Sequence, residues 1–148
     1  MKKIEKCDET RYLRAHLILA KRLGLIDDDS LEALESRRLA KIAENEECER
    51  LERVYYGPIT YTPRMYAEYE MTRFRLDFVE PVASVKASGL APKISKNKKM
   101  AFYKENADLF TRCTMEPFSY KEVELVIEKR LKEIAYEKLI EDILCEPG

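Results

Sequence analysis

Residues 54–69 read VYYGPITYTPRMYAEY and separate two predicted helices. Gly57-Pro58 is a helix-breaking pair, because glycine tolerates a left-handed backbone and proline has no backbone N–H to donate. Thr62 is of the residue type that caps helix N-termini, and Pro63 suits the first helical position. The stretch therefore predicts a sharp corner between a helix that ends near Tyr55 and a helix that starts at Thr62.

Helical spacing of apolar residues extends on both sides of this corner. Gly24 follows the first helix in the position where glycine ends helices, and Ser30 is a predicted N-cap for the second. Ser119 and Glu122 have the spacing of a capping box before the last helix. Five helices are predicted, over residues 9–23, 30–55, 62–80, 95–110 and 119–144, with residues 81–93 as a connector. We expect an all-α fold in a single domain, residues 1–148.

The composition agrees with this fold class and narrows the function. The chain has 148 residues, 45% hydrophobic and 37% charged, with only 4 Gly and no Trp, which favours helices over sheets. Its net charge of −1 lacks the basic excess of a dedicated nucleic-acid binder. No apolar run approaches the length of a membrane span, and no apolar segment follows the first basic residues as in a signal peptide. A cytosolic protein and an exported protein with a trimmed signal both remain open.

Residues that would carry chemistry are sparse. The sequence holds no glycine-rich phosphate loop, no GxSxG and no HExxH motif. Cys7, Cys48, Cys113 and Cys145 lie far apart, which speaks against zinc and against a redox dithiol. His16 stands alone, and we expect it at the surface or at an interface. We therefore predict no catalytic residues, no metal, no cofactor and no enzymatic activity.

Several stretches together resemble the helical domains of SurA/PrsA-type foldases. They are ILAKRLGLIDDDSLEAL, AENEECER with Asn45 and Arg50, and the tyrosine-rich corner, followed by MAFYKENADLF and PFSYKEVELVIEKRLKEIAYEKLIEDIL. The resemblance covers most of residues 12–144. It implies a SurA N-terminal-like domain whose long last helix packs back on the N-terminal helices. The broad apolar stripe of residues 123–143 agrees with a helix that is buried on more than one side.

One part of these foldases is missing. Their parvulin isomerase domain would lie between Phe110 and Pro117, where this chain has six residues, too few for a domain. The resemblance therefore implies a chaperone-like module without isomerase activity that binds unfolded or extended polypeptide segments. It is also compatible with a homodimer, including one formed by exchange of arms.

Tyrosine and methionine side chains offer large, adaptable contact surfaces for peptides. On this basis the expected peptide-binding residues are Tyr55, Tyr56, Tyr61, Met65, Tyr66, Tyr69 and Phe74. The competing interpretation is that the tyrosines only wedge the helix corner. The alternative function is a structural or regulatory helical protein, associated with DNA through a helix-turn-helix in residues 9–55. The acidic end of the second predicted helix argues against nucleic acid as a partner.

Overall fold

The structure is a computed structural model that describes residues 2–55 and 57–146, with side chains from residue 9 onward. It is all-helical, and the described residues contain no β-strand, only a single bridge between Thr111 and Pro117. Six α-helices and one 3-10 turn follow one another: α1 Lys2–Arg22, α2 Leu31–Arg50, α3 Pro63–Val79, α4 Ala83–Ser88, α5 Lys96–Glu105, η1 Ala107–Phe110 and α6 Tyr120–Cys145. The all-α prediction is confirmed, with one helix more than expected.

Local capping signals explain most of the helix starts. Ser30 accepts a hydrogen bond from the backbone N–H of Ala33, and Thr62 from that of Met65. Ser119 and Glu122 form the predicted capping box at the start of α6. These contacts satisfy N–H groups that have no partner inside the helix.

The end of α2 differs from the prediction. The helix stops at Arg50 rather than near Tyr55, because Glu52 adopts a left-handed backbone with φ 55°. The N–H of Arg53 then bonds to the carbonyl of Cys48 at 2.7 Å and closes the last turn. Gly57, at φ 88°, turns the chain a second time, farther along. The connector prediction for residues 81–93 was also incomplete, since Ala83–Ser88 forms α4 and ends at Gly89, φ 76°.

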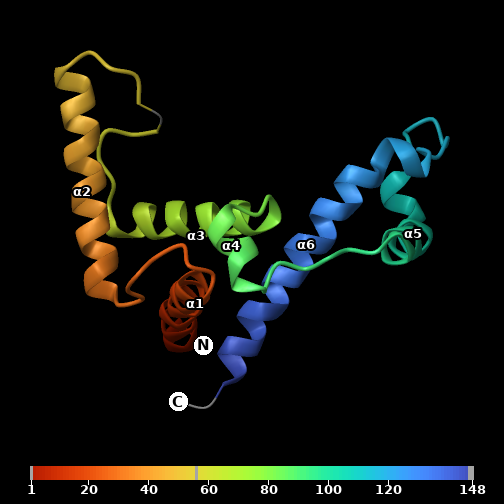
Figure 1. Cartoon of the computed structure of the whole chain (residues 1–148), viewed down its shortest axis with the longest axis horizontal. Coiled ribbons are helices and arrows are strands. Elements are labelled where there is room, and N and C mark those ends of the chain that lie inside the picture. The colour runs from red at the N-terminus through yellow and green to blue at the C-terminus, as the bar shows by residue number, and fades with distance from the viewer. Residues whose placement is uncertain (1, 56, 147–148) are drawn as a thin grey trace.

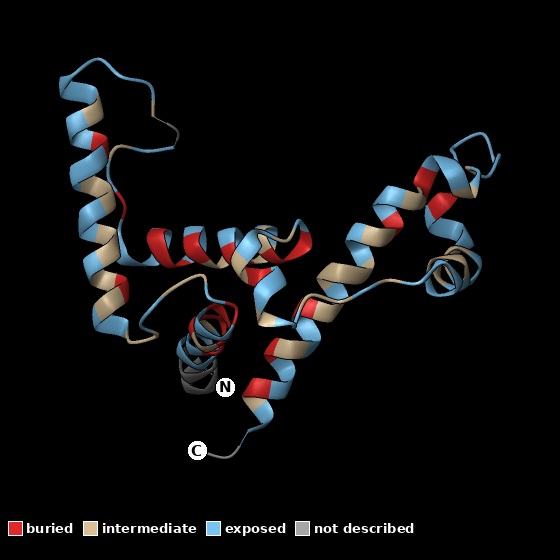
Figure 2. Cartoon of the chain, viewed as in Figure 1, coloured by how far each residue is buried: buried red, intermediate tan, exposed pale blue. Residues whose placement is uncertain are grey.

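The main hydrophobic core lies where α1, α3 and the C-terminal half of α6 meet, with α2 and α4 against it (Figures 1 and 2). Leu17, Leu23, Phe78 and Tyr136 are completely buried there. The predicted contact between the last helix and residues 9–23 is confirmed. The guanidinium of Arg11, for instance, donates to the backbone carbonyl of Leu144 at 2.7 Å.

A second, smaller cluster lies at the other end of α6. Val123 and Ile127 pack there against Phe110, with aromatic side chains of α5 around them. Figure 1 shows α6 running diagonally from α1 to α5. The wide apolar stripe therefore serves two cores in succession along one helix. Beside the buried Val123 and Ile127, the helix also carries apolar side chains that face solvent, with Leu125 69% and Val126 60% exposed.

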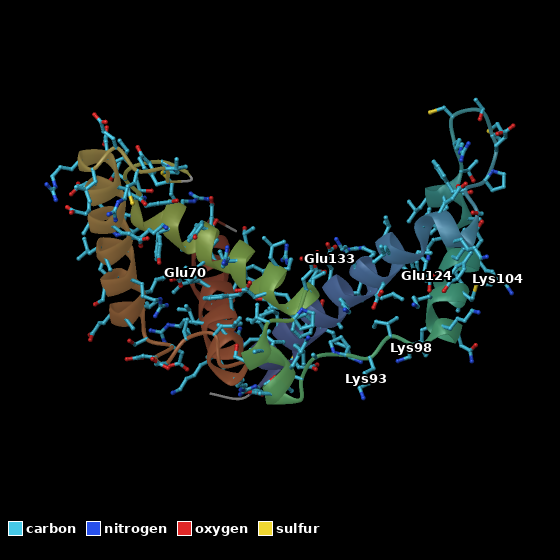
Figure 3. The ribbon with its side chains drawn as sticks, turned by 45° about the horizontal axis from the view of Figure 1, so that its top comes forward. Glu70, Lys93, Lys98, Lys104, Glu124 and Glu133 are labelled. Carbon is cyan, nitrogen blue, oxygen red and sulfur yellow. The ribbon has the colours of Figure 1, made fainter. Side chains whose placement is uncertain are left out.

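The basic residues near α5 form a solvated surface. Figure 3 shows Lys93, Lys98 and Lys104 extending from the connector and from α5. Lys99 is the exception, because its ammonium pairs with Glu124 of α6 at 3.0 Å. No helix within residues 2–55 and 57–146 is long and apolar enough to span a membrane.

Candidate functional site

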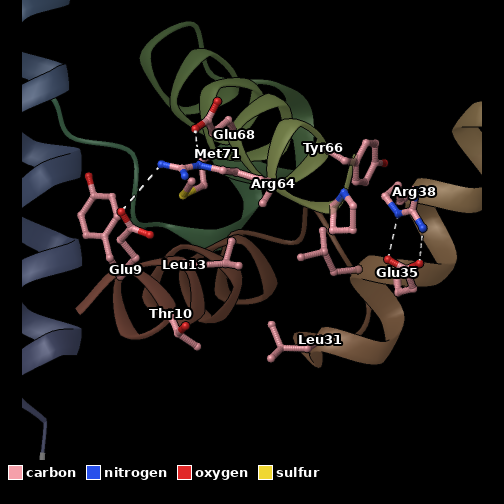
Figure 4. A pocket seen from close by; sticks show the side chains of 14 residues that line it. Glu9, Thr10, Leu13, Leu31, Glu35, Arg38, Arg64, Tyr66, Glu68 and Met71 are labelled. Carbon is pink, nitrogen blue, oxygen red and sulfur yellow. Dashed lines mark hydrogen bonds and ion pairs between the residues drawn. The ribbon is translucent and has the colours of Figure 1, made fainter. Parts of the chain in front are cut away.

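The first candidate site is a cleft between α1, α2 and α3, of about 450 Å³ (Figure 4). Its floor is apolar, with Leu13 from α1, Leu31 from α2 and Met71 from α3. Its rim is charged. We call this site the α1–α3 cleft.

Arginines neutralise the carboxylates on the rim of the α1–α3 cleft. Arg64 lies 3.8 Å from Glu9 and 3.5 Å from Glu68. Arg38 holds the carboxylate of Glu35 through two nitrogens, and this hydrogen bonding lowers the pKa of Glu35. The cleft therefore offers an apolar floor under a rim of ion pairs. Glu35, as an ionised carboxylate, does not suit general acid catalysis, which requires a proton held near neutral pH.

The second candidate site is a cavity of about 740 Å³ between the C-terminal half of α2, the chain at 54–61 and α3. Its α2 wall consists of Lys41, Glu44, Asn45 and Cys48. The opposite side consists of Val54, Tyr55, Gly57, Pro58 and Tyr61, with Tyr69 and Arg73 from α3. We call this site the tyrosine cavity.

Two partly buried hydrogen bonds hold the walls of the tyrosine cavity. The side-chain amide of Asn45 is 1% exposed and donates to the backbone carbonyl of Pro58 at 3.0 Å. Arg38 donates to the carbonyl of Tyr61 at 2.8 Å. Both contacts tie α2 to the chain that follows it, and they position the tyrosines of that chain.

The predicted peptide-binding residues do not form one surface. Tyr55, Tyr61 and Tyr69 line the tyrosine cavity, whereas Tyr66 lines the α1–α3 cleft. Met65 is exposed and lines neither of these two sites, Phe74 is part of the main core, and Tyr56 lies outside the described residues. The rings of Tyr61, Tyr66 and Tyr69 contact one another, with centroids 5.6 to 5.7 Å apart. Tyr61 and Tyr66 are 5% and 6% exposed, so these two rings do fill the helix corner.

An ion pair under this corner was not foreseen from the sequence. Arg37 of α2 donates to both oxygens of Glu70 of α3, at 2.7 and 3.0 Å, and Glu70 is 6% exposed. Burial and the Glu70 carboxylate raise the pKa of Tyr66. A pair separated by 33 positions carries no local sequence signal.

His16 is buried at the contact between α1 and α6. Of the two expected positions, at the surface or at an interface, the surface position is therefore wrong. Its Nδ1 lies 2.6 Å from the hydroxyl of Tyr136, and Tyr12 packs edge-on against its ring. Burial, with a smaller contribution from the charge of Arg75, lowers the pKa of His16 to about 4. The arrangement joins two helices rather than presenting a base to a substrate. Within the described part of the chain, no group of three or more His, Cys, Asp or Glu side chains could hold a metal ion.

Comparison with known proteins gives a specific result. No protein-family model matches the sequence, and no curated protein matches it either. The native structure of a GH136 lacto-N-biosidase from Eubacterium ramulus is similar, with a TM-score of 0.76 and 25% sequence identity. Its selenomethionine derivative gives a TM-score of 0.75 at the same identity. The matches cover 93% and 90% of this chain, but only 28% and 27% of those chains.

These neighbours overturn the identification as a SurA/PrsA-type foldase domain. The similar chain is a glycoside hydrolase, which contradicts the expected chaperone function. The expected polypeptide partners and the expected homodimer are not supported either. The prediction that the chain is not an enzyme is contradicted as well, because the neighbour is an enzyme. The earlier resemblance rested on short helical motifs. Such motifs recur wherever helices have similar caps and apolar spacing, whatever the function of the protein.

Proposed function

We propose that this chain is the helical part of a glycan-hydrolysing enzyme related to lacto-N-biosidase. The observation that carries the proposal is the structural match over 93% of the chain at a TM-score of 0.76 and 25% identity. Since the chain spans 28% of that enzyme chain, the proposal assigns it a part of such an enzyme.

Three carboxylates of this chain do not suit the role of general acid in glycoside hydrolysis. Glycoside hydrolysis generally uses two carboxyl groups, one of which stays protonated so that it can donate to the leaving oxygen. The described carboxylates with shifted pKa values are Asp28, Glu35 and Glu124, and hydrogen bonds lower the pKa of each. All three therefore favour the ionised form. We place the general acid on the larger remainder of the enzyme.

The surface of the chain suits association with that remainder. Leu125 and Val126 lie exposed on α6, and Leu109 and Met115, 70% and 82% exposed, lie beyond α5. We call α5, η1 and the N-terminal end of α6 the arm of the molecule. Exposed apolar side chains that are grouped in this way are typical of a protein interface. The long α6 holds this arm away from the main core (Figure 1).

An exchange experiment tests the proposal. In the Eubacterium ramulus enzyme, the segment that matches this chain is deleted, or is replaced by residues 1–148. We expect the deletion to lose hydrolysis of the enzyme's own substrate and the replacement to restore a measurable part of it. As a control, the segment is replaced by an unrelated helical domain of the same length, which should not restore activity.

Two results would contradict the proposal. A replacement enzyme no more active than the deletion would show that the chain cannot serve as this part. Hydrolysis by the isolated chain, at a rate unchanged by the remainder of the enzyme, would place the general acid on the chain itself.

A further inference from the structure

The side chains that line the tyrosine cavity combine aromatic rings with charged and polar groups, as in a small-molecule site. Its volume of about 740 Å³ lies within the usual range of ligand pockets, about 300 to 1,000 Å³. Aromatic rings and a few polar groups converge on it from three segments of the chain. By contrast, the carboxylates on the rim of the α1–α3 cleft are already paired with arginines.

We propose that the tyrosine cavity binds a neutral saccharide of one or two rings, with Tyr69 and Tyr55 as stacking platforms. This inference rests on the proposed function, because the comparison with a glycoside hydrolase is what selects sugars among small polar ligands. It goes beyond that function in placing a sugar site on the helical part of the enzyme, separate from the general acid.

The tyrosines supply the apolar half of the recognition. A pyranose ring carries a face of C–H groups, and an aromatic ring can cover this face while a phenolic hydroxyl stays hydrated. Tyr69 is 37% exposed and Tyr55 is half-buried, so both keep ring surface within reach of a ligand. Tyr61 is buried, and its ring centroid lies 5.6 Å from that of Tyr69, which supports the platform from behind.

The α2 wall and Arg73 supply the polar half. Sugar hydroxyls both donate and accept hydrogen bonds, and here Lys41 and Arg73 can donate while Glu44 can accept. Charges of both signs at the rim favour a neutral ligand over an anion or a cation. Arg73 retains freedom to turn toward a ligand, since its pair with Asp77 is long, 3.7 Å, and its side chain is 63% exposed.

The walls are positioned before any ligand binds. Asn45 is buried, and its side-chain amide donates to the carbonyl of Pro58. The hydroxyl of Tyr61 lies close against Gly57, since a Cβ added to Gly57 would be 2.8 Å from this hydroxyl. A fixed cavity loses little conformational entropy on binding, which is how a shallow sugar site reaches measurable affinity.

Titration of the full 148-residue chain tests the inference. The chain is titrated with galactose, with N-acetylglucosamine and with a disaccharide of the two. Binding is followed through the NMR shifts of the backbone amides. Sorbitol is the matched control, because it has hydroxyls but no ring face. We expect saturable shifts at Lys41, Tyr69 and Arg73 with the sugars, and none with sorbitol.

Variants identify the platform. Tyr69→Ala should weaken binding about tenfold or more, the usual effect of losing a central aromatic contact, while Tyr69→Phe should bind nearly as the parent does. Tyr12→Ala is the control, since Tyr12 is similarly exposed, at 39%, but lines the α1–α3 cleft. If Tyr69→Ala does not fold by circular dichroism, Lys41→Met takes its place and should weaken binding severalfold.

The inference fails if no sugar causes saturable shifts at tens of millimolar, if sorbitol acts like the sugars, or if the shifts fall in the α1–α3 cleft. It also fails if the parent chain and Tyr69→Ala bind equally. The exchange experiment separates this failure from that of the proposed function. A replacement enzyme that hydrolyses glycans, made with a chain that binds no sugar, would refute the sugar site alone. Sugar binding by a chain that restores no activity would refute the proposed function alone.

Discussion

Replacing Arg37 by methionine should destabilise the fold strongly, because it leaves the carboxylate of Glu70 buried without its cation. The guanidinium donates two hydrogen bonds to Glu70, whose side chain is 7% exposed, while the side chain of Arg37 is 27% exposed. Breaking a buried ion pair by removing one partner costs about 3 to 5 kcal/mol. The partial exposure of Arg37 places the expected loss at the lower end, about 3 kcal/mol.

The assay is urea unfolding followed by circular dichroism at neutral pH. Arg130→Met is the matched control, because Arg130 pairs with Glu133 at 3.2 Å on the exposed face of α6 and should cost no more than about 0.5 kcal/mol. The double variant Arg37→Met with Glu70→Gln removes the stranded charge. It should recover about 2 kcal/mol of the loss from Arg37→Met, within the coupling range of contacting residues.

Two outcomes would refute this reasoning. If the free energy of unfolding of Arg37→Met lies within about 0.5 kcal/mol of that of the parent chain, the ion pair stabilises the fold no more than an exposed pair does. If the double variant is less stable than Arg37→Met by the full cost of Glu70→Gln, the two side chains are not energetically coupled.

Three further perturbations test the contacts that shape the fold. The pKa of His16 is about 4 in the folded chain and 6.5 in the unfolded chain, so between these pH values the unfolded chain binds one more proton. His16 should therefore contribute about 3 kcal/mol to the free energy of unfolding. This contribution is present above pH 6.5 and is lost as the pH falls to about 4. Stability measured against pH in His16→Gln should lack this component. Gly57→Ala should lower the free energy of unfolding in urea more than Gly89→Ala does. Both glycines have a positive φ, so alanine is strained at either position. Of the two, Gly57 alone has an atom close to the added Cβ, the hydroxyl oxygen of Tyr61 at 2.8 Å. Equal losses would mean that Tyr61 yields freely. Ser119→Ala should cost about 0.5 to 2 kcal/mol through the lost N-cap of α6, and Ser119→Thr should keep most of that stability in the same assay.

Interactions within one or two turns of a helix were readable from the sequence. Ser30, Thr62 with Pro63, and Ser119 with Glu122 marked helix starts correctly, since a capping side chain bonds a backbone N–H only three residues away. The exceptions had weak local signals. Glu52 ends α2 in a conformation that its residue type does not announce, and α4 is only six residues long.

The candidate sites depended on contacts that periodicity does not encode. The sequence grouped its tyrosines at one corner, but the crossing of α1, α2 and α3 assigned Tyr66 to the α1–α3 cleft and Tyr69 to the tyrosine cavity. Residues three positions apart on a helix are neighbours, yet which of two cavities each one lines depends on where the partner helices cross.

The sequence by itself determined the helical class of this protein and most of its helix starts, because those depend on interactions between near neighbours in the chain. Only the tertiary structure decided that α6 spans two separate cores, that His16 lies buried against Tyr136, and that Arg37 meets Glu70. Such contacts join residues 33 to 120 positions apart. Their formation depends on how whole helices dock, and a pattern of apolar residues states that a face is buried without stating against what.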